Sequence, residues 1–160
     1  MISQLDDLVA KEKIFSAFKN FPLFQGLPDE VLVVFFVAAQ EEIYRSGQVI
    51  MKEGDHGQEL YIIGDGSVDV CINYEQESKT VLAKLSKNDF FGEMCVIEPS
   101  LRSATVVAAE TTLLYSLKST SLNKVYQVWP EQQSTIMTNL AHQLSQRVQK
   151  LDDTYFSRAW

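Results

Sequence analysis

Short apolar segments separated by turn-forming residues fill the middle of the chain, from Glu41 to Leu117. Polar residues and glycines mark the turns, at residues 45–47, 53–57, 64–66, 73–79 and 86–89. Short strands at such regular spacing are typical of an all-β sandwich or a jelly roll. The middle of the chain is therefore predicted to form an antiparallel β-roll.

Two of these segments alternate with the period of a β-strand. In residues 68–72, Asp69 and Cys71 fall on the face opposite the valines. In residues 81–86, Lys84 falls opposite the apolar set. A period of two predicts half-buried strands with one face in the core.

Helical signals precede this middle part. Residues 4–20 place apolar groups on one stripe, and Pro22 ends that pattern. Pro28 and two acidic residues then start a second helix that is predicted to extend to Ala39. Its β-branched and aromatic run, residues 31–37, would favour a strand by propensity alone. The prediction of a helix there rests on the start signal and on the resemblance given below.

Helical signals also follow the middle part. Residues 119–128 predict a short helix with a serine near its start, and Trp129 and Pro130 interrupt it. Pro130 then opens a longer helix. The apolar stripe of this long helix consists of Ile136, Leu140, Leu144, Val148 and Leu151.

Composition narrows the class of protein. A chain of 160 residues fits one domain, and 46% hydrophobic residues suffice for a core. The formal net charge of −7 argues against a nonspecific nucleic-acid surface. No stretch has the apolar length of a membrane span, and the acidic, polar N-terminus does not have the pattern of a signal peptide. We expect no DNA-binding module in this chain.

The two cysteines, Cys71 and Cys95, have no metal-ligand spacing. We expect two reduced, buried thiols and a cytoplasmic protein. A redox-sensing Cys95 is the alternative.

The segment from Asp89 to Val107 concentrates residue types that suit a small phosphorylated sugar. Gly92 permits a sharp turn and a close approach of the backbone to a ligand. Glu93 can accept hydrogen bonds from ribose hydroxyls, and Arg102 can present a planar fork of donors to a phosphate. The alternatives are a helix N-terminal carboxylate for Glu93 and, for Arg102, a surface arginine or an ion pair with Glu93 or Glu98.

The order Phe91-Gly92-Glu93, then Arg102-Ser103-Ala104, resembles the phosphate-binding cassette of cyclic nucleotide-binding domains. The resemblance extends over residues 21–149, through the glycines at 54 and 66 and the segment at 22–27. It implies an α+β fold: an antiparallel β-roll or jelly roll (a double-stranded β-helix) flanked by N-terminal and C-terminal helices. We expect a single domain over residues 1–160. Its parts would be helices at 1–40, a β-roll at 41–118 with the cassette at 89–107, and helices at 119–160.

The resemblance also implies a ligand, cAMP in preference to cGMP, and no further cofactor. Ser103 does not decide between the two bases. The implied ligand-binding residues are Phe91, Gly92, Glu93, Met94, Cys95, Arg102, Ser103 and Ala104. The base is expected under the turn from Gln143 to Arg147. Three aromatic residues near the end are candidates for a lid: Tyr155, Phe156 and Trp160. The alternative is a frayed tail or a dimer contact.

Three positions depart from the family pattern without removing a ligand group. Asn88 stands where glycine is frequent, but asparagine tolerates the same left-handed turn. Leu101 replaces a frequent proline, and Cys95 replaces a smaller residue. These departures bear on affinity more than on binding itself.

The sequence offers no catalytic or metal site. The two histidines, His56 and His142, are far apart, and a metal centre on a jelly roll needs several ligands at strand spacing. We expect a non-enzymatic sensor whose partner is an effector protein or a second copy of the chain. A degenerate domain that acts only in protein interaction or dimerisation stays open, as does a metal-dependent jelly-roll enzyme.

Overall fold

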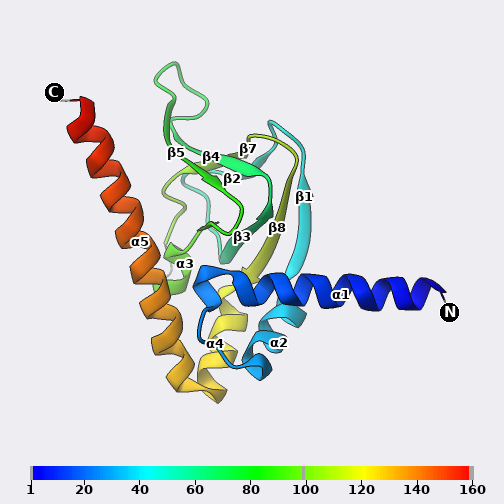
Figure 1. Cartoon of the computed structure of the whole chain (residues 1–160). Helices are drawn as coiled ribbons and strands as arrows, with labels where there is room; N and C mark the ends of the chain where they lie inside the picture. The colour runs from blue at the N-terminus through cyan, green and yellow to red at the C-terminus, as the bar shows by residue number, and fades with distance from the viewer. Residues whose placement is uncertain (1, 99, 159–160) are drawn as a thin grey trace. The chain divides into compact units, whose positions relative to one another are not determined.

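The computed structural model describes residues 2–98 and 100–158, with side chains for residues 11–98 and 100–151. The helices are α1 (Ile2–Asn20), the 3₁₀ helix η1 (Pro22–Phe24), α2 (Asp29–Ala38), α3 (Met94–Ile97), α4 (Ser119–Val128) and α5 (Pro130–Arg158). The strands are β1 (Gln40–Tyr44), β2 (Val49–Met51), β3 (Glu59–Asp65), β4 (Ser67–Ile72), β5 (Thr80–Ser86), β6 (Phe90–Phe91), β7 (Thr105–Ala108) and β8 (Thr112–Lys118). Figure 1 follows the chain through these elements.

The strands form the two antiparallel sheets of a jelly roll. One four-stranded sheet has the order β1-β8-β3-β6, and the other has the order β2-β7-β4-β5. Neighbouring strands in both sheets run antiparallel, and strands distant in sequence, such as β1 and β8, lie side by side (Figure 1). The predicted fold class, an α+β jelly roll with flanking helices, is confirmed.

Alternating side chains from both sheets fill the interior of the roll. Its core cluster consists of Tyr61, Ile63, Val68, Leu85, Phe91, Val106 and Leu114. Burying apolar side chains of this size contributes about 1.5–3 kcal/mol each. Phe91 belongs both to this core and to the predicted cassette, so the cassette is anchored to the roll at Phe91.

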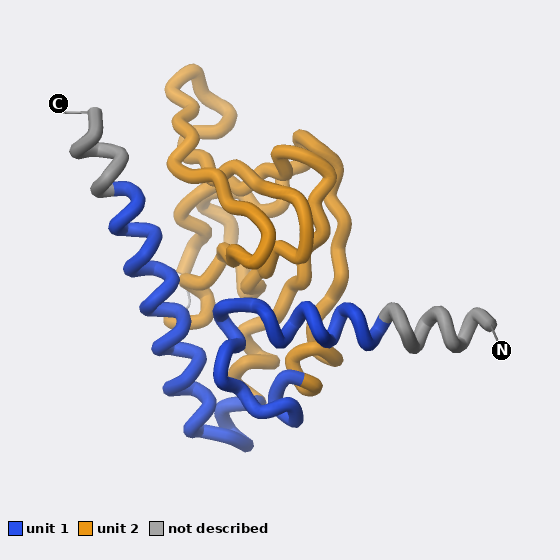
Figure 2. Tube along the Cα trace, viewed as in Figure 1, with its two compact units in different colours: residues 1–32, 125–160 blue, residues 33–124 orange. Residues whose placement is uncertain are grey.

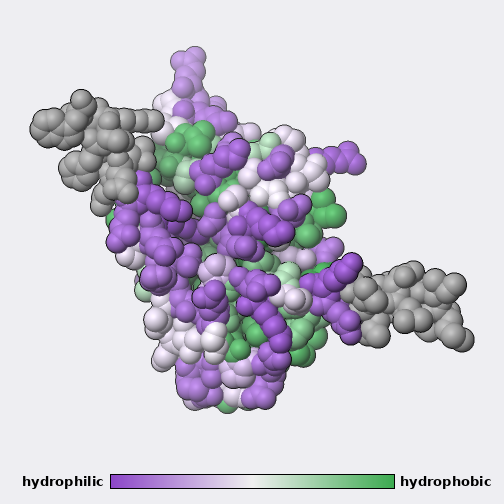
Figure 3. Space-filling view, in the orientation of Figure 1, coloured by the Kyte–Doolittle hydropathy of each residue, from purple (hydrophilic) through white to green (hydrophobic). Residues whose placement is uncertain are grey.

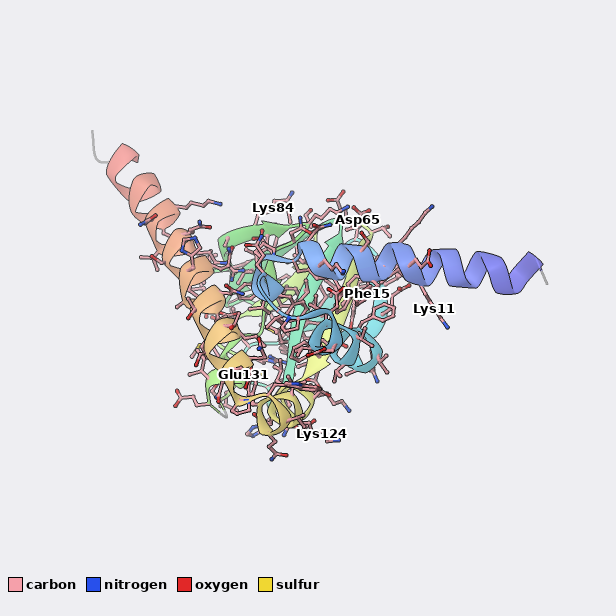
Figure 4. The ribbon with its side chains drawn as sticks, turned by 60° about the horizontal axis from the view of Figure 1, so that its bottom comes forward. Lys11, Phe15, Asp65, Lys84, Lys124 and Glu131 are labelled. Atoms are coloured by element: carbon pink, nitrogen blue, oxygen red, sulfur yellow. The ribbon has the colours of Figure 1, made fainter. Side chains whose placement is uncertain are left out.

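The alternation predicted for β4 and β5 holds only in part. On β5, the Lys84 side chain is exposed (Figure 4), whereas the next side chain, Leu85, is buried. On β4, the register shifts between Val70 and Cys71, and Cys71 is fully buried. The residue skipped in this shift is Leu82 on β5, and β4 pairs with β7 without a shift from Val68 to Cys71, so β4 keeps its predicted alternation.

The helix predicted after Pro28 is present in spite of its strand-like composition. The backbone N–H groups of Val31 and Leu32 donate to the Pro28 carbonyl at 3.0 and 3.1 Å, which closes the first turn. Asp29 and Glu30 supply negative charge at the N-terminal end of the helix dipole. Local start signals thus outweigh β-propensity in this segment.

The chain divides into two compact units (Figure 2). Unit 1 comprises residues 1–32 and 125–160, and unit 2 comprises residues 33–124, which include the jelly roll. The three-part division of a single domain stays a prediction.

Unit 1 has its own aromatic centre. The rings of Phe18 and Phe24 stack at 5.7 Å between centroids, and Phe21 lies 5.2 Å from Phe18. Asn139 of α5 donates from Nδ2 to the carbonyls of Leu23 and Gln25 at 3.0 and 2.8 Å, so α5 is bonded directly to η1 and the residue after it.

Hydrophilic residues dominate the face of the molecule drawn in Figure 3, as the acidic composition would suggest, and hydrophobic residues show between them. Among the described residues, no helix combines the length and the apolar character that crossing a membrane requires.

Candidate functional site

Backbone pairing fixes the position of Arg102. The residue lies in the loop between α3 and β7. Its N–H donates to the Asp55 carbonyl at 2.8 Å, and its own carbonyl accepts from the Gly54 N–H at 2.8 Å. An antiparallel bridge joins the preceding Leu101 to His56. The loop that carries Arg102 is therefore paired with the turn before β3.

The Arg102 side chain is buried, with 6% of it exposed. Its Nη1 donates to the Glu59 carbonyl at 2.9 Å and lies 3.5 Å from the Gly92 carbonyl. Its Nη2 forms an ion pair with the Glu59 carboxylate at 3.3 Å. The alternatives of a surface arginine and of a pair with Glu93 or Glu98 are wrong, because the sheet brings Glu59 to this position.

Two glycines make room for the guanidinium. A Cβ at Gly57 would overlap the Arg102 guanidinium. A Cβ at Gly92 would lie 2.7 Å from the Glu59 carbonyl oxygen and 2.8 Å from Nη1 of Arg102. The guanidinium carbon also lies 5.8 Å from the centroid of the Tyr61 ring, a cation–π distance. We call Gly57, Glu59, Tyr61 and Gly92 the arginine cradle.

The electrostatics of this region follow from burial. Burial raises the pKa of the Tyr61 phenol, and the carboxylates of Glu42 and Glu59 raise it further. The Tyr61 ring stacks on Phe91 at 5.0 Å between centroids, which links the cradle to the core of the roll.

The Cys95 thiol is half-buried, so the expectation of full burial is wrong. Burial raises the pKa of this thiol, although Arg102 opposes the shift by its charge and by a hydrogen bond. A raised pKa leaves little thiolate at neutral pH, which disfavours the alternative of a redox-sensing cysteine.

The remaining cassette residues surround α3. Gly92 has a φ of 76°, and Glu93 follows as the N-terminal cap residue of the helix, half-buried and with no hydrogen bond from its side chain to the helix. Met94 and Ser103 are exposed, whereas Ala104 is buried. Asn88 has a φ of 73°, so the prediction that asparagine supports a left-handed turn here is confirmed.

The predicted base-covering residues lie on a different unit from the cassette. Gln143 and Arg147 belong to α5 in unit 1, so their assignment stays a prediction. The structure does not describe the side chains of the predicted lid residues Tyr155 and Phe156. The third predicted lid residue, Trp160, lies outside the described residues.

The structure adds nothing in favour of a metal site. His56 and His142 are both exposed, as expected. In the part of the chain that the structure describes, no three His, Cys, Asp or Glu residues gather as metal ligands.

A hollow of about 220 Å³ opens beside the β4–β5 turn, and Thr105 is the cassette residue that lines it. Its lining consists of Lys52, Glu53, Asn73, Tyr74, Glu75, Gln76 and Thr105. Polar groups there bond to one another, since Lys52 pairs with Glu75 at 2.9 Å and the Glu53 N–H donates to the Thr105 hydroxyl at 3.0 Å. None of the predicted site residues lines it, so the candidate site is the cradle and the cassette.

Sequence reasoning missed the roles of Gly57, Glu59 and Tyr61. The turn containing Gly57 was visible as a turn signal, but nothing local indicates that it faces Arg102. Glu59 stands 43 residues before Arg102, and its importance follows only from strand pairing.

Comparison with known proteins identifies the domain family of this chain. The family model for the cyclic nucleotide-binding domain matches residues 41–128. The cAMP-dependent protein kinase regulatory subunit of Dictyostelium discoideum is 30% identical over 72% of this chain and 35% of its own length. The cyclic AMP receptor protein of Thermus thermophilus is 31% identical over 84% of this chain and 60% of its own length.

A crystal structure of a cyclic nucleotide-binding domain from Methylobacillus flagellatus has the same fold, with a TM-score of 0.78 at 23% identity over 93% of this chain and 84% of that one. The chain spans less than two thirds of the length of the kinase regulatory subunit and of the receptor protein named above. The matched residues 41–128 contain the whole arginine cradle and the cassette. This chain belongs to the cyclic nucleotide-binding domain family.

Proposed function

We propose that this chain is a regulatory module that binds a cyclic nucleotide, with cAMP preferred to cGMP. The observation that carries the proposal is a buried arginine held beside the positive-φ glycine of the cassette. A buried guanidinium presents its donors in a fixed fork, which suits the two exocyclic oxygens of a cyclic phosphodiester. The preference for cAMP is supported by the two curated relatives, whose names refer to cAMP.

The residues would divide the ligand between them. Arg102 binds the phosphate, Glu93 accepts a hydrogen bond from the ribose 2′-hydroxyl, and the turn of α5 from Gln143 to Arg147 covers the base. The family is one of binding domains, and the chain would sense its ligand without chemical turnover. Ligand binding would then act by a population shift in the helices. Slower amide exchange in α5 with cAMP would support its role, and unchanged exchange would contradict it.

Calorimetric titration of the chain with cAMP and cGMP tests the proposal. Arg102→Leu should weaken cAMP binding by about thirtyfold or more, since loss of one partner of a desolvated charge pair costs about 2–5 kcal/mol. Arg45→Leu is the matched control, because Arg45 is an exposed arginine of the same unit. Equal affinity of the Arg102 variant, with its fold intact by circular dichroism, would contradict the site.

Titration with 2′-deoxy-cAMP tests whether Glu93 binds the ribose 2′-hydroxyl. The wild type should bind 2′-deoxy-cAMP more weakly than cAMP, and Glu93→Ala should bind the two ligands alike. Removing either end of one hydrogen bond makes the other end irrelevant. Discrimination that persists in the variant would assign the ribose to another residue.

A second candidate function is a domain that acts only in protein interaction or self-association. One observation favours it: Arg102 already has carbonyl and carboxylate partners within its own unit. The absence of any binding to either nucleotide, together with a concentration-dependent oligomer in sedimentation, would support this candidate. We also propose that the module acts on an effector protein and that it is cytoplasmic. The free thiols of Cys71 and Cys95 agree with a cytoplasmic location.

A further inference from the structure

The Arg102 guanidinium has two kinds of partner within its own unit. Nη1 donates to a neutral acceptor, the Glu59 carbonyl, at 2.9 Å and has the Gly92 carbonyl at 3.5 Å. Nη2 faces the charged carboxylate of Glu59 at 3.3 Å. The neutral partners leave the positive charge uncompensated, whereas the carboxylate neutralises it. A ligand phosphate would bring a second negative charge to the same guanidinium.

We propose that the Glu59 carboxylate is an internal competitor for the ligand phosphate at Arg102, and that Glu59 thereby sets the affinity of this module. The inference rests on the proposed function, because it assigns a competitor to the same arginine. Two anions cannot share the Nη2 donor without repelling each other. Ligand binding would therefore require the Glu59 carboxylate to move away from Arg102.

The two partners differ in their freedom to move. The Glu59 side chain is 32% exposed, whereas the Arg102 side chain is 6% exposed. The carboxylate can therefore rotate into water, while Arg102 stays held at Nη1 by backbone carbonyls and under the Tyr61 ring. The mobile element of the pair is the glutamate, and the preformed element is the arginine.

A second contact holds the carboxylate in the competing position. The backbone N–H of Gln58 donates to the same Glu59 oxygen, Oε2, at 3.1 Å. Oε2 thus accepts hydrogen bonds from Gln58 and from Arg102 together. We call this arrangement, in which the Glu59 carboxylate occupies Arg102, the closed state. If Arg102 is open to the ligand only a fraction of the time, the measured affinity is the intrinsic affinity multiplied by that fraction.

The test compares wild type, Glu59→Gln and Glu77→Gln in calorimetric titrations with cAMP. Glutamine at 59 keeps the size of the side chain and the backbone carbonyl but removes the competing charge. Glu77→Gln changes the net charge of the same unit by the same amount at an exposed turn position, so it controls for long-range electrostatics. We expect Glu59→Gln to bind cAMP about tenfold more tightly than wild type, as for an open fraction near one tenth. Glu77→Gln should match wild type.

The outcomes separate this inference from the proposed function. If wild type binds cAMP and a folded Glu59→Gln binds it equally or more weakly, the competitor role is overturned and the cyclic nucleotide site stands. If only Glu59→Gln binds, competition in the wild type is complete and both proposals are supported. If neither binds, both are overturned.

Glu59→Asp provides a second variant in case glutamine disturbs the fold. It keeps the charge but shortens the side chain, so the carboxylate reaches Nη2 less well. Affinity should rise by less than in Glu59→Gln. An affinity at or below that of wild type would contradict competition through direct contact.

Discussion

Gly92 is the residue at which the local conformation and the site constrain each other most closely. Its φ of 76° disfavours any side chain, and an added Cβ would meet the Glu59 carbonyl oxygen at 2.7 Å. A glycine is therefore required here both for the turn and for the approach of Arg102.

We expect Gly92→Ala to lower the free energy of unfolding by about 1–3 kcal/mol, measured by denaturant titration. Gly47→Ala is the matched control, because Gly47 has a φ of 85° but no atom within 4 Å of its added Cβ. The control isolates the cost of positive φ, and the excess in Gly92→Ala measures crowding against the cradle. Equal losses in the two variants would show that the close approach to Glu59 and Arg102 is unimportant.

At the scale of elements, one side chain bonds α5 to η1. Both Nδ2 protons of Asn139 are used, one for Leu23 and one for Gln25. The two carbonyls lie at the end of a 3₁₀ helix, where the next helical donors are missing. Asn139 therefore substitutes for backbone donors that this turn lacks.

Asn139→Asp should destabilise unit 1, because a carboxylate cannot donate and repels the two carbonyl oxygens. The loss should be about 1–3 kcal/mol, the usual cost of leaving such acceptors unsatisfied. Amide exchange in residues 22–25 should become faster in the same variant. Asn123→Asp, at an exposed position on α4, should change neither measurement, and an equal effect there would attribute the loss to charge alone.

For the whole molecule, tyrosine burial predicts how stability depends on alkaline pH. Burial raises the pKa of Tyr126 from 10.0 to about 12. The pKa of Tyr44 is also raised, by burial and by its hydrogen bond to the Glu42 carboxylate. Burial likewise raises the pKa of Tyr61 and Tyr115.

The folded state keeps these protons to higher pH than the unfolded state does. Their contribution to stability is complete below about pH 10 and is lost as pH rises toward 12 and above. Denaturant unfolding at a series of pH values should therefore show the free energy of unfolding falling above pH 10.

Tyr126→Phe removes one of these groups and tests its share. Its buried hydroxyl has no hydrogen-bond partner among the described protein atoms, so the variant should be as stable as wild type at pH 8 or more stable by about 1 kcal/mol. The fall between pH 10 and 12 should be smaller than in wild type. An identical pH profile in the two proteins would contradict the contribution of Tyr126.

The sequence by itself determined most of the helices and strands. Residues 119–128 form the predicted short helix, and Pro130 begins the long one. The turn signals at 45–47, 53–57 and 73–79 fall between observed strands, whereas those at 64–66 and 86–89 overlap the ends of β3 and β5. Start signals, turn residues and periodicity act over a few residues, so they can be read locally. The positions of Gly92 and of Asn88 at positive φ followed from the same local chemistry.

Only the tertiary structure decided what surrounds Arg102. Its partner is Glu59 and not Glu93 or Glu98, because the pairing of the loop at 101–102 with the turn at 54–56 brings the start of β3 to the guanidinium. The register shift between β4 and β5, which leaves Leu82 without a partner on β4, likewise has no local signal. Sheet pairing and register bring together residues that are distant in sequence, and a local sequence pattern does not predict which distant residues pair.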